Sequence, residues 1–223
     1  MMEHLHVDDC DSTQDLLKEQ LDRTPAADWV VSCENQSRGY GRGSNMWTAM
    51  PGTLCFSMTI SPHPIPTLTS LEMGLLIRDF FDTRKLKLRL KWPNDLFVEQ
   101  KKCGGLIIQS YKSTYVLGLG INLYTSNSEF GGLFKSEIIF SKQDLSWRIA
   151  DYIREHRIKD SHLIRERWLA NCDHLHKRVQ IIEHQIISEG IFIGIGEVGE
   201  AILKNDEGET KSYFNGSLRV KLT

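Results

Sequence analysis

The pattern of predicted elements changes after residue 177, and this change constrains the fold more than any other feature of the chain. Before it, strand-like apolar runs alternate with amphipathic helices. The helices are predicted at 13–21, 68–83, 144–156 and 160–171. From Arg178 onward only short β runs follow, separated by turn signals such as Asn215-Gly216. We therefore expect an α/β domain over 1–174 and a small all-β domain, a barrel or sandwich, over 175–223.

The first domain carries apolar and β-branched runs between its predicted helices. These strands are predicted at 29–33, 53–60, 88–91, 96–98, 106–108 and 115–121. The alternation of helices and strands favours a β-sheet flanked by helices.

The composition excludes several classes of protein. With 40% hydrophobic residues and a net charge of -2, the 223-residue chain can bury a core and is not expected to be disordered. Its 27 Lys and Arg are balanced by 29 Asp and Glu, so no basic field attracts nucleic acid and we expect no DNA binding. No run approaches the roughly 18 apolar residues of a membrane span. The N-terminus also lacks the basic and apolar regions of a secretory signal.

Cysteine usage favours a reducing compartment. The five cysteines are scattered and include no Cys-x-x-Cys pair. Neither a disulfide framework nor a zinc site is expected, so we predict a cytoplasmic protein.

A glycine-rich segment from Gln36 to Trp47 is the first candidate for a ligand site. Glycines at positions 39, 41 and 43 let the backbone approach a ligand closely. Arg42 among them offers a planar donor for a phosphate or carboxylate. The spacing matches neither the Rossmann nor the Walker A motif. A surface loop with a chance arginine remains an alternative.

Two further segments combine polar residues with glycines. Lys91-Trp92-Pro93-Asn94-Asp95 precedes Lys101-Lys102-Cys103-Gly104-Gly105, where a lysine beside bare backbone can reach an anion. A plain hairpin turn is the alternative for the first part. Gly118-Leu119-Gly120-Ile121-Asn122 places glycines inside a strand, which often marks close ligand approach. On its own, Asn122 is more typical of a turn.

Together these segments resemble the biotin protein ligase family, also called biotin–[acetyl-CoA carboxylase] ligases or holocarboxylase synthetases. The resemblance rests on Gln-x-x-Gly-x-Gly-Arg-Gly-x-Asn-x-Trp, Lys-Trp-Pro-Asn-Asp with its downstream Lys-x-Gly-Gly, and Gly-x-Gly-Ile-Asn, in the family's order. Asp11-Ser12-Thr13-Gln14 and Ser217-Leu218-Arg219 extend it to both ends. It implies a class II synthetase-like α/β catalytic domain with a mixed sheet, capped by a C-terminal SH3-like β-barrel.

The resemblance also implies a two-step reaction. ATP activates the biotin carboxylate as biotinyl-5′-AMP with release of pyrophosphate, and a lysine of a biotin carboxyl carrier protein then takes the biotin. The implied catalytic residues are Lys102, Arg42 and Asp95. The implied biotin-binding residues are Ser12, Thr13, Gln14, Gln36, Tyr40, Gly41, Arg42, Lys102 and Gly105. The implied ATP-binding residues are Arg42, Gly43, Trp47, Lys102, Asn122 and Arg219. Mg²⁺ is expected with ATP, and no protein ligand is assigned to it.

Three positions depart from the family pattern. Gln14 stands where many members carry Asn, and Ser44 stands where a small residue is expected. Tyr40 stands where Arg or Lys is usual, which removes one positive charge. The loop over 39–45 is expected to be disordered without ligand because of its glycines.

The resemblance also bears on partners. The default acceptor is the biotin carboxyl carrier protein of acetyl-CoA carboxylase. The Asp-Ser-Thr segment begins at Asp11, which leaves no room for the DNA-binding domain of the repressor members, so a monofunctional ligase is expected. The sheet edge near Ile107 could pair in a homodimer.

Two rival functions remain. Lipoate–protein ligases share the fold and the adenylation chemistry, and a non-catalytic biotin or nucleotide sensor would keep only the pocket. Outside the motifs, His174-Leu175-His176 could bind a metal, although a surface linker is the favoured interpretation.

Overall fold

The computed structural model describes residues 2–25, 27–43, 45–136, 141–183 and 185–221. Its main sheet has seven strands in the order β1-β2-β5-β9-β8-β7-β6. They are β1 (Met2–Cys10), β2 (Asp28–Gln36), β5 (Thr53–Ile60), β6 (Arg89–Lys91), β7 (Asp95–Val98), β8 (Lys101–Tyr111) and β9 (Thr114–Asn122). β1 runs parallel to β2 and the other pairs are antiparallel, so the sheet is mixed.

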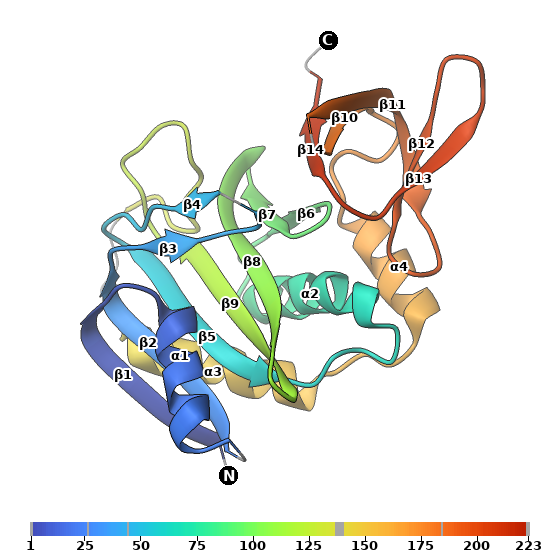
Figure 1. The fold of residues 1–223 in the computed structure, drawn as a ribbon. Helices are drawn as coiled ribbons and strands as arrows, with labels where there is room; N and C mark the ends of the chain where they lie inside the picture. Colours follow the sequence, from blue (N-terminus) through green and yellow to red (C-terminus); the bar gives the residue numbers. More distant parts are fainter. Residues whose placement is uncertain (1, 26, 44, 137–140, 184, 222–223) are drawn as a thin grey trace.

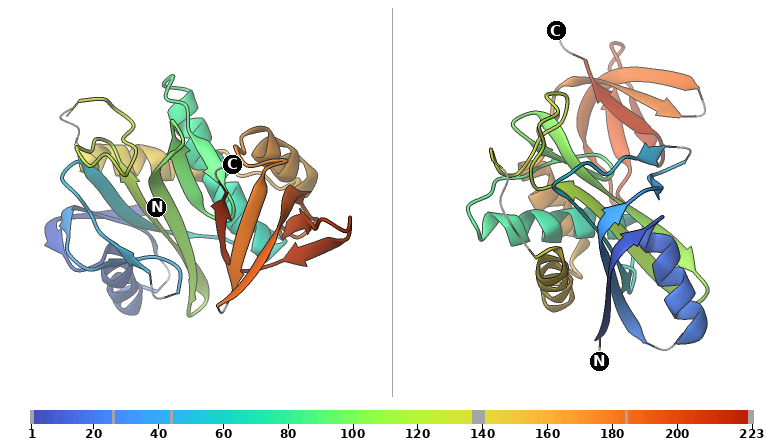
Figure 2. Two further views of the ribbon diagram at one scale, coloured as in Figure 1. Left: turned by 90° about the horizontal axis from the view of Figure 1, so that it is seen from above. Right: turned by 90° about the vertical axis from the view of Figure 1, so that its left-hand side faces the viewer.

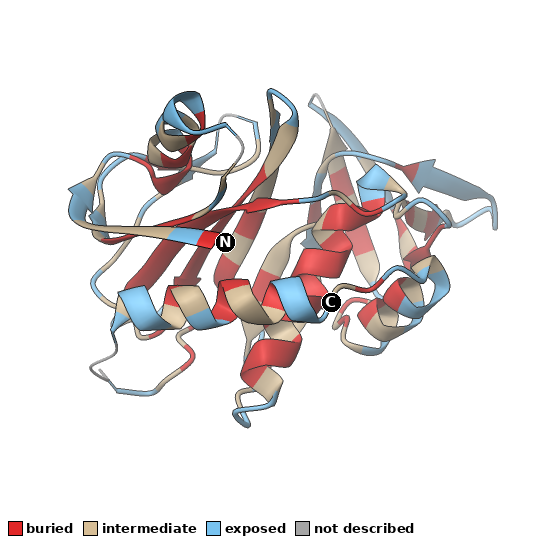
Figure 3. Ribbon diagram, turned by 90° about the horizontal axis from the view of Figure 1, so that it is seen from below, coloured by how far each residue is buried: buried red, intermediate tan, exposed pale blue. Residues whose placement is uncertain are grey.

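Helices cover both faces of this sheet (Figures 1 and 2). α1 (Thr13–Arg23) packs on one face, and α2 (Thr69–Asp82) and α3 (Lys142–Glu155) pack on the other. α2 is preceded by a short 3-10 turn, η1 (Pro66–Leu68). Because β5 is covered on both faces, every residue from Thr53 to Ile60 is buried, which explains its imperfect alternation. The predicted mixed sheet flanked by helices is confirmed. In Figure 3, most of α2 is coloured as buried, whereas α3 shows more intermediate and exposed residues.

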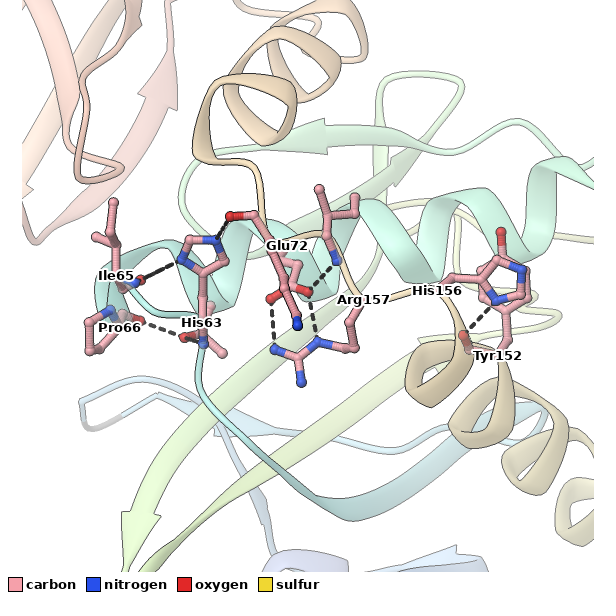
Figure 4. Close-up of polar contacts among 10 residues, drawn as sticks. His63, Ile65, Pro66, Glu72, Tyr152, His156 and Arg157 are labelled. Carbon is pink, nitrogen blue, oxygen red and sulfur yellow. Dashed lines mark hydrogen bonds and ion pairs between the residues drawn. The ribbon is translucent and has the colours of Figure 1, made fainter.

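A buried ion pair fixes the chain after α3 to α2 (Figure 4). Glu72 is fully buried and accepts two hydrogen bonds from Arg157, at 2.7 and 2.9 Å, and one from the Ile158 N–H at 2.9 Å. Nearby, His63 Nδ1 accepts from the Ile65 N–H at 2.9 Å, which leaves Nε2 to donate to the Lys159 carbonyl at 3.1 Å. These hydrogen bonds satisfy buried polar groups, which would destabilise the folded protein if they were left unpaired.

The C-terminal unit is a five-stranded antiparallel sheet in the order β13-β12-β11-β10-β14. Its strands are β10 (Arg178–Glu183), β11 (Ile186–Ile195), β12 (Ala201–Lys204), β13 (Thr210–Tyr213) and β14 (Ser217–Val220). The expected small all-β unit is present. Among the described residues its two edge strands, β13 and β14, do not pair with each other, so the barrel is not closed. α4 (Ser161–Ala170) leads into it, and Trp92 Nε1 donates to the Gly199 carbonyl at 3.0 Å. Both units share one hydrophobic core.

The surface-linker interpretation of 174–176 holds for His176, which is exposed, but it is wrong for His174. His174 is not part of a surface linker, because it is 1% exposed and its ring lies between Trp168 and Phe192. Its Nδ1 lies 3.1 Å from Cys172 Sγ. No group of three or more His, Cys, Asp or Glu side chains in the described residues could hold a metal ion. In the same part of the chain, every helix is too short or too polar to cross a bilayer.

Candidate functional site

A cleft of about 990 Å³ opens where the main sheet, the glycine-rich loop and the C-terminal sheet meet. Its walls come from the start of α1, the 36–47 segment, the β6–β7 turn with β8, and the centre of β9. The turn before β14 supplies the wall from the C-terminal unit. Residues from most of the chain length therefore converge on one cavity.

The N-terminus of α1 forms one end of the cleft. Ser12 occupies the N-cap position, but its side chain makes no capping bond to the described residues of α1, so its hydroxyl is available to a ligand. The Thr13 N–H donates to Gln36 Oε1 at 2.9 Å, and the Thr13 hydroxyl lies 2.9 Å from Ser57 Oγ. The bond from Thr13 fixes the orientation of the Gln36 side chain in the cleft wall.

Gln14 supplies a buried acceptor at the same end. It is 4% exposed, and its Nε2 donates to the Ile107 carbonyl at 3.4 Å. Its Oε1 is buried and has no hydrogen-bond partner among the described residues. Gly118 makes room for this side chain, because a Cβ there would lie 2.4 Å from Gln14 Nε2. An unpaired buried carbonyl lining a cleft fits a ligand that brings its own N–H donor.

The glycine-rich segment folds as a short hairpin over the cleft. Its strands are β3 (Gly39–Tyr40) and β4 (Met46–Trp47). Gly43 adopts a φ of +63° near the tip, a conformation that favours glycine. The Trp47 ring packs on Gly120, where a Cβ would lie 2.4 Å from the indole. The two glycines of β9 thus leave space for Gln14 and Trp47 on the same face of the strand.

Arg42 connects the hairpin to the C-terminal sheet. Its Nη1 donates to the Gly216 carbonyl at 3.1 Å across 174 residues of sequence. Burial lowers the pKa of its guanidinium, and the nearby Asp95 carboxylate opposes that shift. Arg42 is therefore a cation, partly withdrawn from solvent, at the junction of the two units.

Two lysines flank one carboxylate at the opposite wall. Asp95 lies 2.6 Å from Lys102 Nζ and 3.0 Å from Lys91 Nζ, and its side chain is 15% exposed. Lys91 and Asp95 are opposed across the β6–β7 turn. The register of β7 against β8 shifts after Leu96, and this bulge turns Lys102 onto the face of Asp95. Gly105 lies opposite Asp95 and leaves space beside the two charges.

Comparison with known proteins identifies the family. A sequence model of the Biotin/lipoate A/B protein ligase family matches residues 7–125, more than half of the chain. The chain belongs to this family. It is 22% identical to biotin–protein ligase 1, chloroplastic, of Arabidopsis thaliana, over 95% of this chain and 67% of that protein. It is 26% identical to the bifunctional ligase/repressor BirA of Escherichia coli, over 95% of this chain and 72% of that protein.

A solved structure agrees with the fold of this ligase. The biotin protein ligase from Aquifex aeolicus, determined in complex with biotin and ATP, superposes with a TM-score of 0.79 at 23% identity and covers 99% of both chains. The recognition of the family from its motifs is confirmed.

Within this ligase, the structure brings nearly all of the predicted site residues to the cleft. The cleft residues among them are Ser12, Thr13, Gln14, Gln36, Tyr40, Gly41, Arg42, Gly43, Trp47, Asp95, Lys102, Gly105 and Arg219. Asn122 does not line it. Its Oδ1 accepts from the Thr53 hydroxyl at 2.9 Å, and its Nδ2 donates to the Gly131 carbonyl at 3.4 Å. Ser44 lies outside the described residues.

Sequence reasoning did not assign a role to Lys91. Lys91 and Asp95 are four residues apart, on either side of a predicted turn. This spacing could have predicted that the two charges meet in a hairpin. The alternative considered for this segment, a hairpin turn, is what joins β6 to β7, and Asp95 at its end also holds the two lysines.

Proposed function

We propose that this member of the family is a biotin–protein ligase that works by adenylation. The observation that carries the proposal is the charge distribution of the cleft. A wall with Lys91, Lys102 and Arg42 faces an end lined by uncharged donors and acceptors around Gln14 and Gln36. A ligand with a neutral polar head and a carboxylate fits this polarity.

In the first step, a carboxylate oxygen of biotin attacks the α-phosphorus of ATP, and pyrophosphate leaves. Carboxylate and phosphate repel each other, so their approach needs fixed positive charge. Lys102 reaches this point from β8, and Arg42 closes over it from the hairpin. Gly41 and Gly43 expose backbone N–H groups there, and Trp47 and Arg219 lie on the proposed nucleotide side.

In the second step, the amine of an acceptor lysine attacks the carbonyl carbon of the adenylate, and AMP leaves. The attacking amine must lose a proton. Asp95 lies at the cleft wall and can attract the acceptor ammonium and take that proton. Arg42 and the hairpin shield the mixed anhydride from water until the acceptor arrives.

Biotin is favoured over lipoate by the neutral end of the cleft. Biotin has a ring with N–H donors and a carbonyl acceptor, whereas the dithiolane ring of lipoate has neither. The unpaired Gln14 Oε1 suits the first ligand, because a partner without a donor leaves this carbonyl unsatisfied.

The proposal is tested by pyrophosphate release from the purified protein with Mg-ATP and either biotin or lipoate. We expect release with biotin and none with lipoate. Release with lipoate alone would reassign the pocket within the family. Release with neither, from folded protein, would support the alternative of a non-catalytic sensor.

Lys102→Ala tests the assignment of the catalytic lysine. Loss of one charge-stabilising donor in a water-excluded site costs about 10²–10³ in rate. The neighbouring Lys101→Ala is the matched control, because Lys101 is exposed and donates to the Ser128 carbonyl instead. Equal rates for the two variants would contradict the assignment.

Four further assignments belong to the proposal. Mg²⁺ is taken to enter with ATP, bound to its phosphates. The acceptor is taken to be the biotin carboxyl carrier protein of acetyl-CoA carboxylase, and the compartment the cytoplasm.

Strand β7 pairs with only the first part of β8, so residues 107–111 offer an edge for a homodimer. Sedimentation of the wild type against Ile108→Pro, which blocks edge pairing, tests the dimer.

A further inference from the structure

The helix that begins at the ligand end of the cleft also holds the glycine-rich hairpin. The Tyr40 hydroxyl accepts from Lys18 Nζ at 2.9 Å and donates to Asp15 Oδ1 at 2.8 Å. Lys18 Nζ also donates to Asp15 Oδ1 at 3.3 Å, which closes a three-membered ring of contacts. We call Tyr40, Asp15 and Lys18 the Tyr40 latch. Gln109 Oε1 of β8 lies 3.4 Å from the same hydroxyl.

The latch joins a thin hairpin to rigid elements. β3 and β4 have two residues each and, within the described part of the chain, pair only with one another. By contrast, α1 is fixed to the sheet by Leu17 and Leu21, which are 0% and 3% exposed. A hairpin this short has little stability of its own, so side-chain contacts to its surroundings decide whether it stays folded.

The hairpin has separate contacts at its base and near its tip. At the base, the Ser37 and Arg38 N–H groups donate to the Cys10 and Asp11 carbonyls, at 3.0 and 2.8 Å. Near the tip, Arg42 donates to the Gly216 carbonyl at 3.1 Å. Tyr40 lies between these points, immediately before Gly41 in the cleft wall. Its contacts therefore hold the part of the hairpin that lies between the base and the Arg42 bond.

The charge state of the latch is consistent with a permanent contact. Burial alone would lower the pKa of Lys18, but the hydrogen bonds and charges of Tyr40 and Asp15 raise it overall. Burial raises the pKa of Tyr40. Lys18 therefore stays protonated and Tyr40 neutral at neutral pH, so donor and acceptor roles do not change there.

We propose that Tyr40 is a positioning residue which, held by Asp15 and Lys18, keeps the glycine-rich hairpin closed over the cleft before any substrate binds. This proposal replaces the expectation, drawn from the glycines alone, that the 39–45 loop is disordered without ligand. The inference deepens the proposed function, because a closed hairpin retains biotin and its adenylate. Gln14 and Lys18 are four residues apart on α1, so one helix face carries both the buried ligand acceptor and the latch. Ligand position and hairpin position are thereby set by a single rigid element.

Hydrogen exchange of the ligand-free protein tests the latch directly. The Gly41 N–H donates to the Asn45 carbonyl at 2.8 Å, so its exchange reports opening of the hairpin. Tyr40→Phe keeps the ring and removes the hydroxyl, and Lys18→Met removes the ammonium. We expect each to speed exchange in 39–47 by about tenfold, the effect of losing a charge-assisted hydrogen bond. Lys18→Arg is expected to restore most of the protection.

Lys112→Met is the matched control. Lys112 pairs with Asp22, which lies in the last turn of α1, one turn beyond Lys18. Equal exchange in the wild type and Tyr40→Phe would overturn the proposal. It would also be overturned if Lys112→Met speeds exchange as much as the latch variants do, since that indicates general loosening of α1.

Kinetics separate positioning from a purely structural role. In the pyrophosphate assay, Tyr40→Phe is expected to raise the KM for biotin about fivefold and to change kcat by less than about twofold. A fall of about fivefold in kcat with an unchanged KM would overturn the positioning role. Because the exchange experiment needs no substrate, failure of ligase activity in the wild type leaves the closed hairpin testable. The two proposals therefore fail separately.

Discussion

At the scale of single residues, the cleft contains a buried polar atom, Gln14 Oε1, that has no hydrogen-bond partner among the described residues. Gln14→Met keeps the length of the side chain and removes the unpaired Oε1. If biotin supplies the missing donor, this change costs about 1–3 kcal/mol of binding, or roughly 5–150-fold in KM. Folding stability should change by less than about 1 kcal/mol, because removing the unpaired Oε1 offsets the loss of the long hydrogen bond from Nε2 to the Ile107 carbonyl.

Pyrophosphate release at varied biotin concentration, together with thermal melting, checks this prediction. Gln20→Met, a half-buried glutamine on the same helix, is the control. An unchanged KM in Gln14→Met would mean that this carbonyl does not contact the ligand.

Arg42 also acts at the residue scale, through its bond to the Gly216 carbonyl. Arg42→Gly is expected to retain adenylate formation but to release the adenylate, because the hairpin loses both its charge and its tether. The measurement is labelling of lysines on a bystander protein, with Arg38→Gly as the control, since Arg38 is exposed and pairs with Asp11. Tight retention of adenylate in Arg42→Gly would contradict a shielding role.

At the scale of elements, most helices and strands could be predicted, and the exceptions have physical causes. β1 was not predicted because Met2–Cys10 is mostly polar for an edge strand, and His4 and His6 bond Ser32 of the neighbouring strand at 2.9 and 2.8 Å. β8 is longer than the predicted 106–108 because its polar ends are held by strand pairing, which periodicity does not report. The β3–β4 hairpin is too short to have a period.

The contact between α2 and the chain after α3 makes a prediction at this scale. Glu72→Gln removes the negative charge that pairs with Arg157, and the side chain at position 72 remains fully buried. Loss of one partner of a buried pair costs about 3–5 kcal/mol, and we expect about 2–4 here because Arg157 is 24% exposed. Urea unfolding measures the loss. Asp144→Asn, in the exposed pair with Arg148, should change stability by less than about 1 kcal/mol.

At the scale of the whole molecule, the motifs predicted which residues meet but not how they meet. Ser12, Arg42 and Lys102 converge as the family resemblance implied. The bulge that turns Lys102 toward Asp95 depends on strand register, and the bond from Arg42 to Gly216 depends on how the two units pack. Neither is encoded in local spacing. Asn122 was placed at the site by its motif, yet it bonds Thr53 and the Gly131 carbonyl instead.

The junction of the two units also determines a response to acid. Burial, with smaller effects from Lys91 and Lys177, lowers the pKa of His174 to about 3. The unfolded chain binds a proton at this histidine below about pH 6.5, whereas the folded chain does not until near its lowered pKa. The stability associated with His174 is therefore constant above about pH 6.5 and falls as the pH is lowered from there toward about 3.

Between pH 7.5 and 4.5 this linkage amounts to about 2–3 kcal/mol of lost unfolding free energy. His174→Asn removes the titrating group, so its stability should fall less over this interval, even if packing against Trp168 and Phe192 lowers its stability at every pH. Urea unfolding at each pH measures the slope, with His162→Asn as the control, because the His162 side chain is 78% exposed. Equal slopes for the wild type and His174→Asn would mean that the junction opens enough for His174 to be protonated in the folded protein.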